Sequence, residues 1–276
     1  MNQKLASYSN LSQRIIAAIV GVSIIVSAVY YSSWSYILIF AIIGAFTQFE
    51  FYKLLGLDGN QPLSYYGTFC GVFLNVLTFL IEKGDLPVRD YYLISPLMAL
   101  IFLIKLYKPN DSKPFMNIAF TFLGMIYVAL PFAILTIIAL PKQHYSYQIV
   151  LGCLFLLWAS DTGAYFAGTK FGKTKLFERV SPKKSWEGSL GGFLFAMLIA
   201  YLLGLYFNDL EPWRWYVIGG IIVVAGTYGD LVESLFKRSI SIKDSGSTIP
   251  GHGGFLDRFD GLLLAVPFII AFTKMF

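Results

Sequence analysis

The sequence is poor in charged residues and almost free of cysteine. Only 13% of its 276 residues are Asp, Glu, Lys or Arg, against roughly a quarter in soluble proteins. Apolar runs follow one another along the chain, which leaves no stretch long enough for a separate water-soluble core. The two cysteines, Cys70 and Cys153, both lie within apolar runs, so a disulfide framework and a zinc site are excluded. We therefore expect an integral membrane protein.

Nine apolar runs are candidate membrane spans. Most approach the roughly 20 residues that a helix needs to cross a membrane, and the fourth and ninth are short. The first follows Lys4 and Arg14 as in a signal peptide, but no cleavage site follows it, so we expect it to be retained. These runs predict an all-α polytopic membrane protein with one domain over residues 1–276, comprising N-terminal spans at about 12–139 and a C-terminal half at about 147–276. The predicted spans lie at about 12–31, 35–55, 63–81, 91–107, 116–139, 147–169, 187–207, 213–236 and 258–276.

The basic residues are distributed unevenly between the two ends of these spans. If the spans alternate in direction and the N-terminus is cytoplasmic, sixteen of the 21 Lys and Arg residues face the cytoplasm and five face outside. Such an excess marks the cytoplasmic side of a membrane protein. We therefore expect a cytoplasmic N-terminus and an external C-terminus. The expected location is the inner (cytoplasmic) membrane of a bacterium.

The densest run of charge lies between Asp230 and Asp260. Asp230, Glu233, Ser234 and Lys237 recur at the spacing of one helical face. Counted from the external ends of their spans, Asp230 and Asp260 lie about 22 and 24 Å deep. A solvated charged face is the ordinary alternative, but charges at such depth are costly unless they line a wet cavity. We therefore predict a polar cavity that opens to the cytoplasm.

A turn-rich loop separates this helical face from the last predicted span. His252 lies in the loop, either as a hydrogen-bonded loop residue or as part of an anion-binding nest of backbone amides. Glycine allows such a backbone to approach a ligand closely. The residues that interrupt helical structure here are Gly246, Pro250, Gly251, Gly253 and Gly254.

Polar residues on and after another predicted span reach a similar depth. Asp161 lies about 20 Å deep, where it either pairs with a lysine or lines the same cavity. Lys183, Lys184 and Ser185 follow in a cytoplasmic loop; lysines there mark topology in any case, and they can also hold an anion. Residues 167–174 match a relaxed phosphate-binding-loop pattern, but a true loop of this kind needs an α/β domain, so we expect none.

The charged stretch carries a longer spaced pattern, Ser234-x2-Lys237-Arg238-x4-Lys243-Asp244-x-Gly246-x2-Ile249-Pro250-x-His252-Gly253-Gly254-Phe255-x-Asp257-Arg258-Phe259-Asp260. This pattern resembles the signature of the phosphatidate cytidylyltransferases, also called CDP-diacylglycerol synthases, and no position departs from it. The segments SPKKSWEG (181–188) and DTGAY (161–165) also resemble that family. The resemblance covers roughly the C-terminal half, which would then be the catalytic half, whereas the N-terminal spans match only in being hydrophobic.

The resemblance implies transfer of CMP from CTP to phosphatidic acid, giving CDP-diacylglycerol and pyrophosphate, with Mg²⁺ required. Because the lipid phosphate is already mostly ionised near pH 7, catalysis would rest on positioning and charge neutralisation. The catalytic residues would be Asp230, Asp257, Lys237 and Ser234. The metal ligands would be Asp230 and Asp257, with Glu233, Asp260 and Asp161 in support. The substrate-binding residues would be Lys183, Lys184, Ser185, Arg238, Lys243, His252, Gly253, Gly254 and Arg258.

The expected partners are CTP, phosphatidic acid and membrane lipids, without nucleic acid. The number of metal ions, a second cation and a homodimer are left open. A cation-binding membrane transporter would explain Asp161 and Asp230, but not the basic, glycine-rich loop on one side only, and no internal repeat is visible. A CTP-dependent polyprenol or phytol kinase, or a cytidylyltransferase for another lipid, stays a second alternative. A CDP-alcohol phosphotransferase would need several closely spaced Asp residues on two helices, which the sequence lacks.

Overall fold

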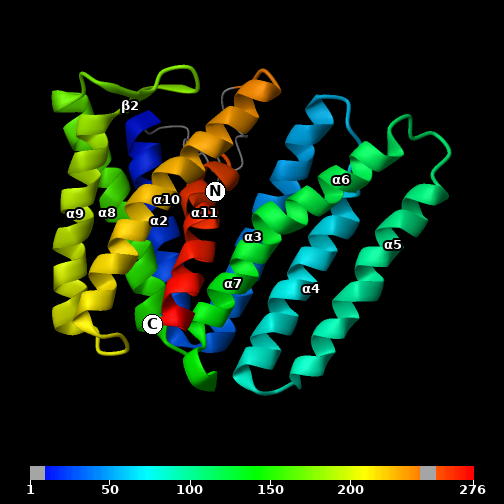
Figure 1. The fold of residues 1–276 in the computed structure, drawn as a ribbon, viewed down its shortest axis with the longest axis horizontal. Helices are drawn as coiled ribbons and strands as arrows, with labels where there is room; N and C mark the ends of the chain where they lie inside the picture. Colours follow the sequence, from blue (N-terminus) through cyan, green and yellow to red (C-terminus); the bar gives the residue numbers. More distant parts are fainter. Residues whose placement is uncertain (1–9, 243–252) are drawn as a thin grey trace.

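The chain forms long helices with one small hairpin (Figure 1). The computed structural model describes residues 10–242 and 253–276. Helices dominate because a backbone in an apolar medium must satisfy its hydrogen bonds internally. The elements are α2 (Asn10–Tyr31), α3 (Ser33–Leu57), α4 (Ser64–Lys83), the 3₁₀ helix η1 (Val88–Leu93), α5 (Ile94–Leu106), α6 (Pro114–Gly124), the π-helical turn η2 (Met125–Ala129), α7 (Leu130–Ala139), the 3₁₀ helix η3 (Pro141–Gln143), α8 (Tyr147–Phe171), β1 (Lys175–Phe177), β2 (Ser181–Ser185), α9 (Trp186–Tyr206), α10 (Pro212–Ser239) and α11 (Leu256–Met275).

Six of the described helices are long and apolar enough to cross a membrane: α3, α4, the continuous segment Pro114–Ala139, α8, α9 and α10. Each of the nine predicted ranges contains a helix, but α5 has only 13 residues, about 20 Å at 1.5 Å per residue. Helix α11 begins with the charged residues Asp257, Arg258 and Asp260. The structure fits a helical membrane protein, and the count of nine spans stays a prediction.

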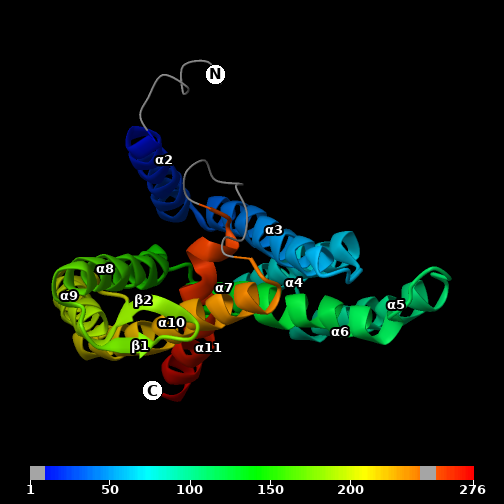
Figure 2. The same cartoon turned by 90° about the horizontal axis from the view of Figure 1, so that it is seen from above.

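The predicted N-terminal and C-terminal halves share one hydrophobic core. Figure 2 shows α8 and α9 on one side and α4, α5 and α6 on the other, with α7, α10 and α11 between them. Buried side chains from both halves pack together, among them Phe40, Phe132, Leu154, Trp215 and Leu263. This packing holds the C-terminal helices against α3 and α7.

A two-stranded antiparallel hairpin joins α8 to α9, where the sequence predicted only a loop. Lys175 pairs with Ser185 and Phe177 with Ser181. Figure 1 shows the hairpin, the α5–α6 connection and the C-terminal end of α10 at one end of the helices, with the C-terminus of the chain at the other. The basic loops that the sequence assigned to one side therefore share one end of the molecule.

Glycines allow the C-terminal helices to approach each other closely. A Cβ on Gly191 of α9 would lie 2.2 Å from Ala167 Cβ and 2.8 Å from Gly163 O on α8. Real Cβ atoms do not reach these distances, so α8 and α9 can pack this closely only where a side chain is absent. A glycine likewise allows α10 and α11 to approach each other closely at the site described below.

The helix that follows α6 widens into a single π-helical turn, Met125–Ala129. Pro131 lies just beyond it. Proline has no N–H to donate to the carbonyl four residues earlier, here that of Tyr127. Turns of this kind often occur at functional positions.

Candidate active site

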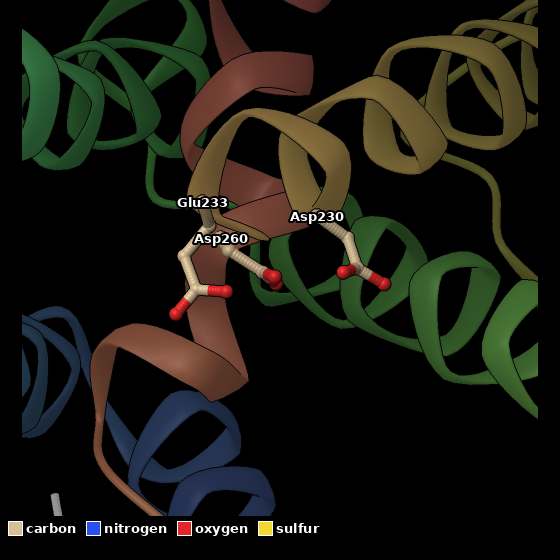
Figure 3. Close-up of side chains that lie close together, drawn as sticks. All are labelled: Asp230, Glu233 and Asp260. Carbon is tan, nitrogen blue, oxygen red and sulfur yellow. The ribbon is translucent and has the colours of Figure 1, made fainter. Parts of the chain in front are cut away.

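Three carboxylates meet where α10 crosses α11 (Figure 3). Asp230 and Glu233 lie one turn apart on α10, and Asp260 lies on α11. One oxygen of each side chain lies within 4.8 Å of the others. Because like charges this close disfavour one another, positive charge nearby stabilises the ionised form of the cluster. The helical spacing that the sequence predicted for Asp230 and Glu233 is present in the structure.

Two glycines make this crossing close. A Cβ on Gly229 would lie 2.5 Å from the carbonyl oxygen of Asp260 and 2.9 Å from the Cα of Gly261. Gly229 directly precedes Asp230, so the absence of its side chain brings the backbones that carry Asp230 and Asp260 together. A larger residue here would separate the two helices and open the carboxylate cluster.

Lys237 bridges two acidic residues on different helices. Its Nζ lies 2.7 Å from Glu233 Oε2 on α10 and 2.7 Å from Asp257 Oδ1 on α11. The side chains of Lys237, Glu233 and Asp257 are 12%, 1% and 14% exposed. The second oxygen of Glu233, Oε1, is buried and has no hydrogen-bond partner among the described residues.

Asp257 also closes a turn at the start of α11. Its Oδ2 accepts a hydrogen bond of 3.1 Å from the backbone N–H of Gly254. Gly253 has a φ of 82°, a conformation that favours glycine, and a Cβ there would lie 2.6 Å from Asp257 Oδ2. Asp257 therefore lies beside Lys237 and the glycine turn, whereas Asp230, Glu233 and Asp260 form the cluster.

The hairpin brings a second lysine to the carboxylates. Lys184 on β2 lies with its Nζ 2.6 Å from Asp230 Oδ2 and donates a hydrogen bond of 3.2 Å to the carbonyl of Thr227. Lys183 is exposed, as expected from the alternation of side chains along a strand. The structure thus places Lys184 at the cluster and Lys183 on the outer face of the hairpin.

Asp161 on α8 is exposed and lies outside the three-carboxylate cluster. Asp230, Lys184 and Arg258 nevertheless act electrostatically on its carboxylate. The structure therefore brings Asp161 near the site without making it part of the closest carboxylate group.

The remaining predicted site residues have other local contacts. Ser185 is the N-cap of α9, and its Oγ accepts a hydrogen bond of 3.1 Å from the N–H of Gly188. Ser234 Oγ lies 3.4 Å from Asp230 Oδ1, and Arg238 donates to the carbonyl of Ile242. Arg258 is exposed on the first turn of α11. Lys243 and His252 lie outside the described residues.

The segment 167–174, in which we expected no phosphate-binding loop, contacts a side chain of the protein itself. The backbone N–H groups of Lys173 and Thr174 donate hydrogen bonds of 3.1 Å to the carboxylate of Glu187. A side chain of the protein therefore occupies the amides that a phosphate-binding loop would offer to a ligand.

Two residues of the N-terminal helices reach this region, and the sequence reasoning missed both. Glu50 on α3 is 6% exposed, and its Oε2 accepts a hydrogen bond of 2.9 Å from the N–H of Phe255. Tyr127 in η2 has a buried hydroxyl without a partner in the described part of the chain. Two features of the sequence could have indicated these residues. Glu50 is the lone acidic residue within the predicted span at 35–55, and Tyr127 lies four residues before Pro131.

The cluster has the donors that a hard divalent cation needs. Mg²⁺ takes oxygen ligands, and carboxylates are its usual protein ligands. Asp230, Glu233 and Asp260 offer such oxygens, and Glu233 Oε1 is a buried oxygen whose hydrogen-bonding capacity is unused within residues 10–242 and 253–276. With Lys184 and Lys237 beside them, these groups fit a cation that carries a phosphate-containing ligand.

Comparison with known proteins gives the family. A model described as the cytidylyltransferase family matches residues 12–276. A phosphatidate cytidylyltransferase of Haemophilus influenzae is 33% identical over 294 residues, which cover 95% of this chain and 98% of that protein. Phosphatidate cytidylyltransferases of Staphylococcus aureus (strain COL) and Staphylococcus haemolyticus are each 34% identical over 221 residues, covering 79% of this chain and 82% of theirs. The chain belongs to the cytidylyltransferase family.

Proposed function

We propose that this protein transfers CMP from CTP to phosphatidic acid, giving CDP-diacylglycerol and pyrophosphate in phospholipid biosynthesis. The names of its relatives, which it matches over most of its length, support the two substrates. The carboxylate cluster of α10 and α11, which has lysines on both sides, is the observation that supports placing this reaction at the crossing of the two helices. This arrangement suits phosphoryl chemistry, in which positioning and charge neutralisation do most of the work.

The reaction requires an in-line displacement at the α-phosphorus of CTP. An oxygen of the lipid phosphate forms the new P–O bond, and the bond to the oxygen that bridges to the β-phosphate breaks, so that pyrophosphate leaves with the electron pair. The second pKa of a phosphate monoester is about 6, so the attacking oxygen is already ionised near pH 7. No strong general base is needed among the residues of the site.

The basic residues would hold the charged groups of the two substrates. Lys184 and Lys237 contact the carboxylate groups, so they can neutralise negative charge that develops on the phosphate oxygens. Arg258, Arg238 and Lys183 lie exposed around them and would attract the anionic substrates. The predicted roles of Lys243 and His252 belong to this group. Ser185, which caps α9, would position the hairpin that carries Lys184.

Asp230, Glu233 and Asp260 would hold a magnesium ion, with Asp257 and Asp161 as further candidates. A bound Mg²⁺ supplies Lewis-acid polarisation of a phosphate oxygen. Asp257 orders the turn at Gly254 and anchors Lys237, and Ser234 supports Asp230. A second cation stays an open part of the proposal.

The membrane arrangement is part of the proposal. We propose a single domain of nine spans, with the N-terminus cytoplasmic, the C-terminus external and a polar cavity at the cytoplasmic side. In support, the basic hairpin and the end of α10 lie at one end of the helices (Figure 1). Such a site would be reached by CTP from water and by phosphatidic acid from the bilayer. A homodimer is compatible with this arrangement.

The test is turnover by purified protein supplied with labelled CTP, phosphatidic acid and Mg²⁺. We expect CDP-diacylglycerol and pyrophosphate from the wild type, and at least a roughly 100-fold lower rate from Asp230→Asn, because the variant loses an anionic ligand of the cluster. Asp85→Asn is the matched control, since Asp85 pairs with Lys83 far along the chain from the site. It should retain the wild-type rate.

The products also separate the alternatives. CDP together with a newly phosphorylated lipid would indicate a CTP-dependent lipid kinase. Cation uptake by vesicles without any turnover of CTP would indicate a transporter. Normal turnover by Asp230→Asn would remove Asp230 from the proposed metal site while leaving the reaction itself in place.

A further inference from the structure

The hydroxyl of the half-buried Tyr127 is a polar group without a partner among the described residues. Its hydroxyl is buried and accepts or donates no hydrogen bond in the described part of the chain. A buried polar group that forms no hydrogen bond is unfavourable. Tyr127 lies in the π-helical turn η2, itself a conformation found often at functional positions. A bound ligand would supply the hydrogen-bond partner that this hydroxyl lacks among the described residues.

A chain of ring contacts links Tyr127 to the helices that carry the carboxylate cluster. Its ring centroid lies 5.7 Å from that of Phe51, which lies 4.9 Å from that of Phe236. Phe236 is on α10, three residues after Glu233 and hence about one turn away. Five residues after Tyr127, Phe132 lies 6.0 Å from Phe259, the neighbour of Asp260.

The electrostatic environment agrees with these contacts. Asp260, Glu233 and Asp230 all act on the Tyr127 hydroxyl. They are the three carboxylates of the cluster. The hydroxyl therefore lies within electrostatic reach of the side chains that would hold a cation, and it comes from the N-terminal half of the chain.

Two buried atoms near the cluster thus remain unpaired among the described residues, Tyr127 Oη and Glu233 Oε1. They do not pair with each other, although a phenol O–H and a carboxylate oxygen are complementary. A cation would take up the carboxylate oxygen. The phenol O–H would then face the oxygen atoms that accompany the cation, and phosphate oxygens are strong acceptors.

We propose that Tyr127 is a substrate-binding residue whose hydroxyl donates a hydrogen bond to a phosphate oxygen of the nucleotide. The inference rests on the proposed function, because it takes CTP as the ligand of the cluster. It extends the active site from the C-terminal helices to η2, in the N-terminal half of the chain.

The variant Tyr127→Phe tests this, since it keeps the ring against Phe51 and removes only the hydroxyl. Equilibrium binding of CTP is measured with Mn²⁺ present and phosphatidic acid absent, so that no turnover occurs. Hydrogen bonds to charged groups contribute about 1.5–3 kcal/mol, so we expect CTP affinity to fall roughly tenfold or more. The midpoint of thermal unfolding without nucleotide should stay at the wild-type value or rise, because the variant lacks an unpaired buried hydroxyl.

Tyr36→Phe is the matched control. Tyr36 is also buried in the core, but its hydroxyl lies 3.2 Å from Thr136 Oγ1, so the control should lose stability and keep its affinity for CTP. Unchanged CTP affinity in Tyr127→Phe would overturn the inference. So would a lower unfolding midpoint alone, which indicates a structural hydroxyl, or a loss of Mn²⁺ affinity alone, which indicates a contact to metal-bound water. Failure of the wild type to turn over CTP would instead count against the proposed function.

Discussion

Replacing Lys237 with methionine removes the cation that contacts both Glu233 and Asp257, while keeping a long unbranched side chain. The two contacts join α10 to the start of α11. The change therefore leaves two carboxylates without their shared partner, one of them on a side chain that is only 1% exposed. We expect this single substitution to weaken both the fold around the site and the activity.

The size of the effect follows from the geometry. At 2.7 Å and an effective dielectric constant of about 20, each pair attracts by roughly 6 kcal/mol. Desolvation of the three charges offsets much of this attraction. Removing one partner of a buried pair typically costs about 3–5 kcal/mol because the remaining charge stays buried. That is a large part of the roughly 5–15 kcal/mol by which folded proteins are stable.

Denaturant unfolding of the detergent-purified protein, followed by tryptophan fluorescence, measures this loss. The double variant Lys237→Met/Glu233→Gln should be about 1–3 kcal/mol more stable than Lys237→Met alone, because glutamine removes the uncompensated charge. Lys173→Met is the control, since Lys173 is exposed in the segment before the hairpin. Its free energy of unfolding should change by no more than about 0.5 kcal/mol.

Wild-type stability in Lys237→Met would refute the reasoning. An equal destabilisation of the single and double variants would also refute it, because the cost would then come from lost packing rather than from an unpaired charge.

Two further substitutions test how the rest of the fold supports the site. Glu50→Ala leaves the N–H of Phe255 without its acceptor, so we expect the free energy of unfolding to fall by about 1–3 kcal/mol and kcat/KM to fall as well. Glu50→Gln keeps an acceptor oxygen and should lose less stability and less activity. Equal losses in the two variants would contradict the role of that hydrogen bond. Gly191→Ala places a Cβ 2.2 Å from Ala167 Cβ, so we expect thermal unfolding to show a loss of stability of about 1–3 kcal/mol. A Cβ at Gly220 meets nothing within 4 Å, so Gly220→Ala should be neutral or stabilising by up to about 1 kcal/mol. The reverse order of stabilities would contradict the close α8–α9 packing.

The positions of the helices could be predicted because apolar runs of this length have few alternatives. The run predicted at 147–169 became α8, Tyr147–Phe171, and its flanks moved by two residues or fewer. The hairpin at β1 and β2 was not predicted. Its sequence is short and basic, without the alternation of apolar residues by which strands are identified. The family, by contrast, was predicted from the spaced pattern between Ser234 and Asp260 and is confirmed by the comparisons.

Within the site, sequence spacing predicted neighbours on one helix better than contacts between helices. Asp230 and Glu233 share a face of α10 as their spacing requires. Asp257 and Asp260 are also three residues apart on one helix, yet Asp257 contacts Lys237 whereas Asp260 joins the cluster. This difference depends on how α11 packs against α10. The two helices approach closely at Gly229, which helical spacing in the sequence does not reveal.

The balance of charge at the crossing is consistent with the divalent cation that we propose for the cluster. Four carboxylates, those of Asp230, Glu233, Asp257 and Asp260, meet two lysines there, Lys184 and Lys237. Asp161 and Arg258, both exposed, carry opposite charges that act on each other and add nothing to this sum. With all four carboxylates ionised, two negative charges are left over in a site where uncompensated charge is costly. A single divalent cation cancels these two charges. The phosphates of a bound nucleotide would add further negative charge, which a metal ion or the surrounding arginines and lysines would have to neutralise.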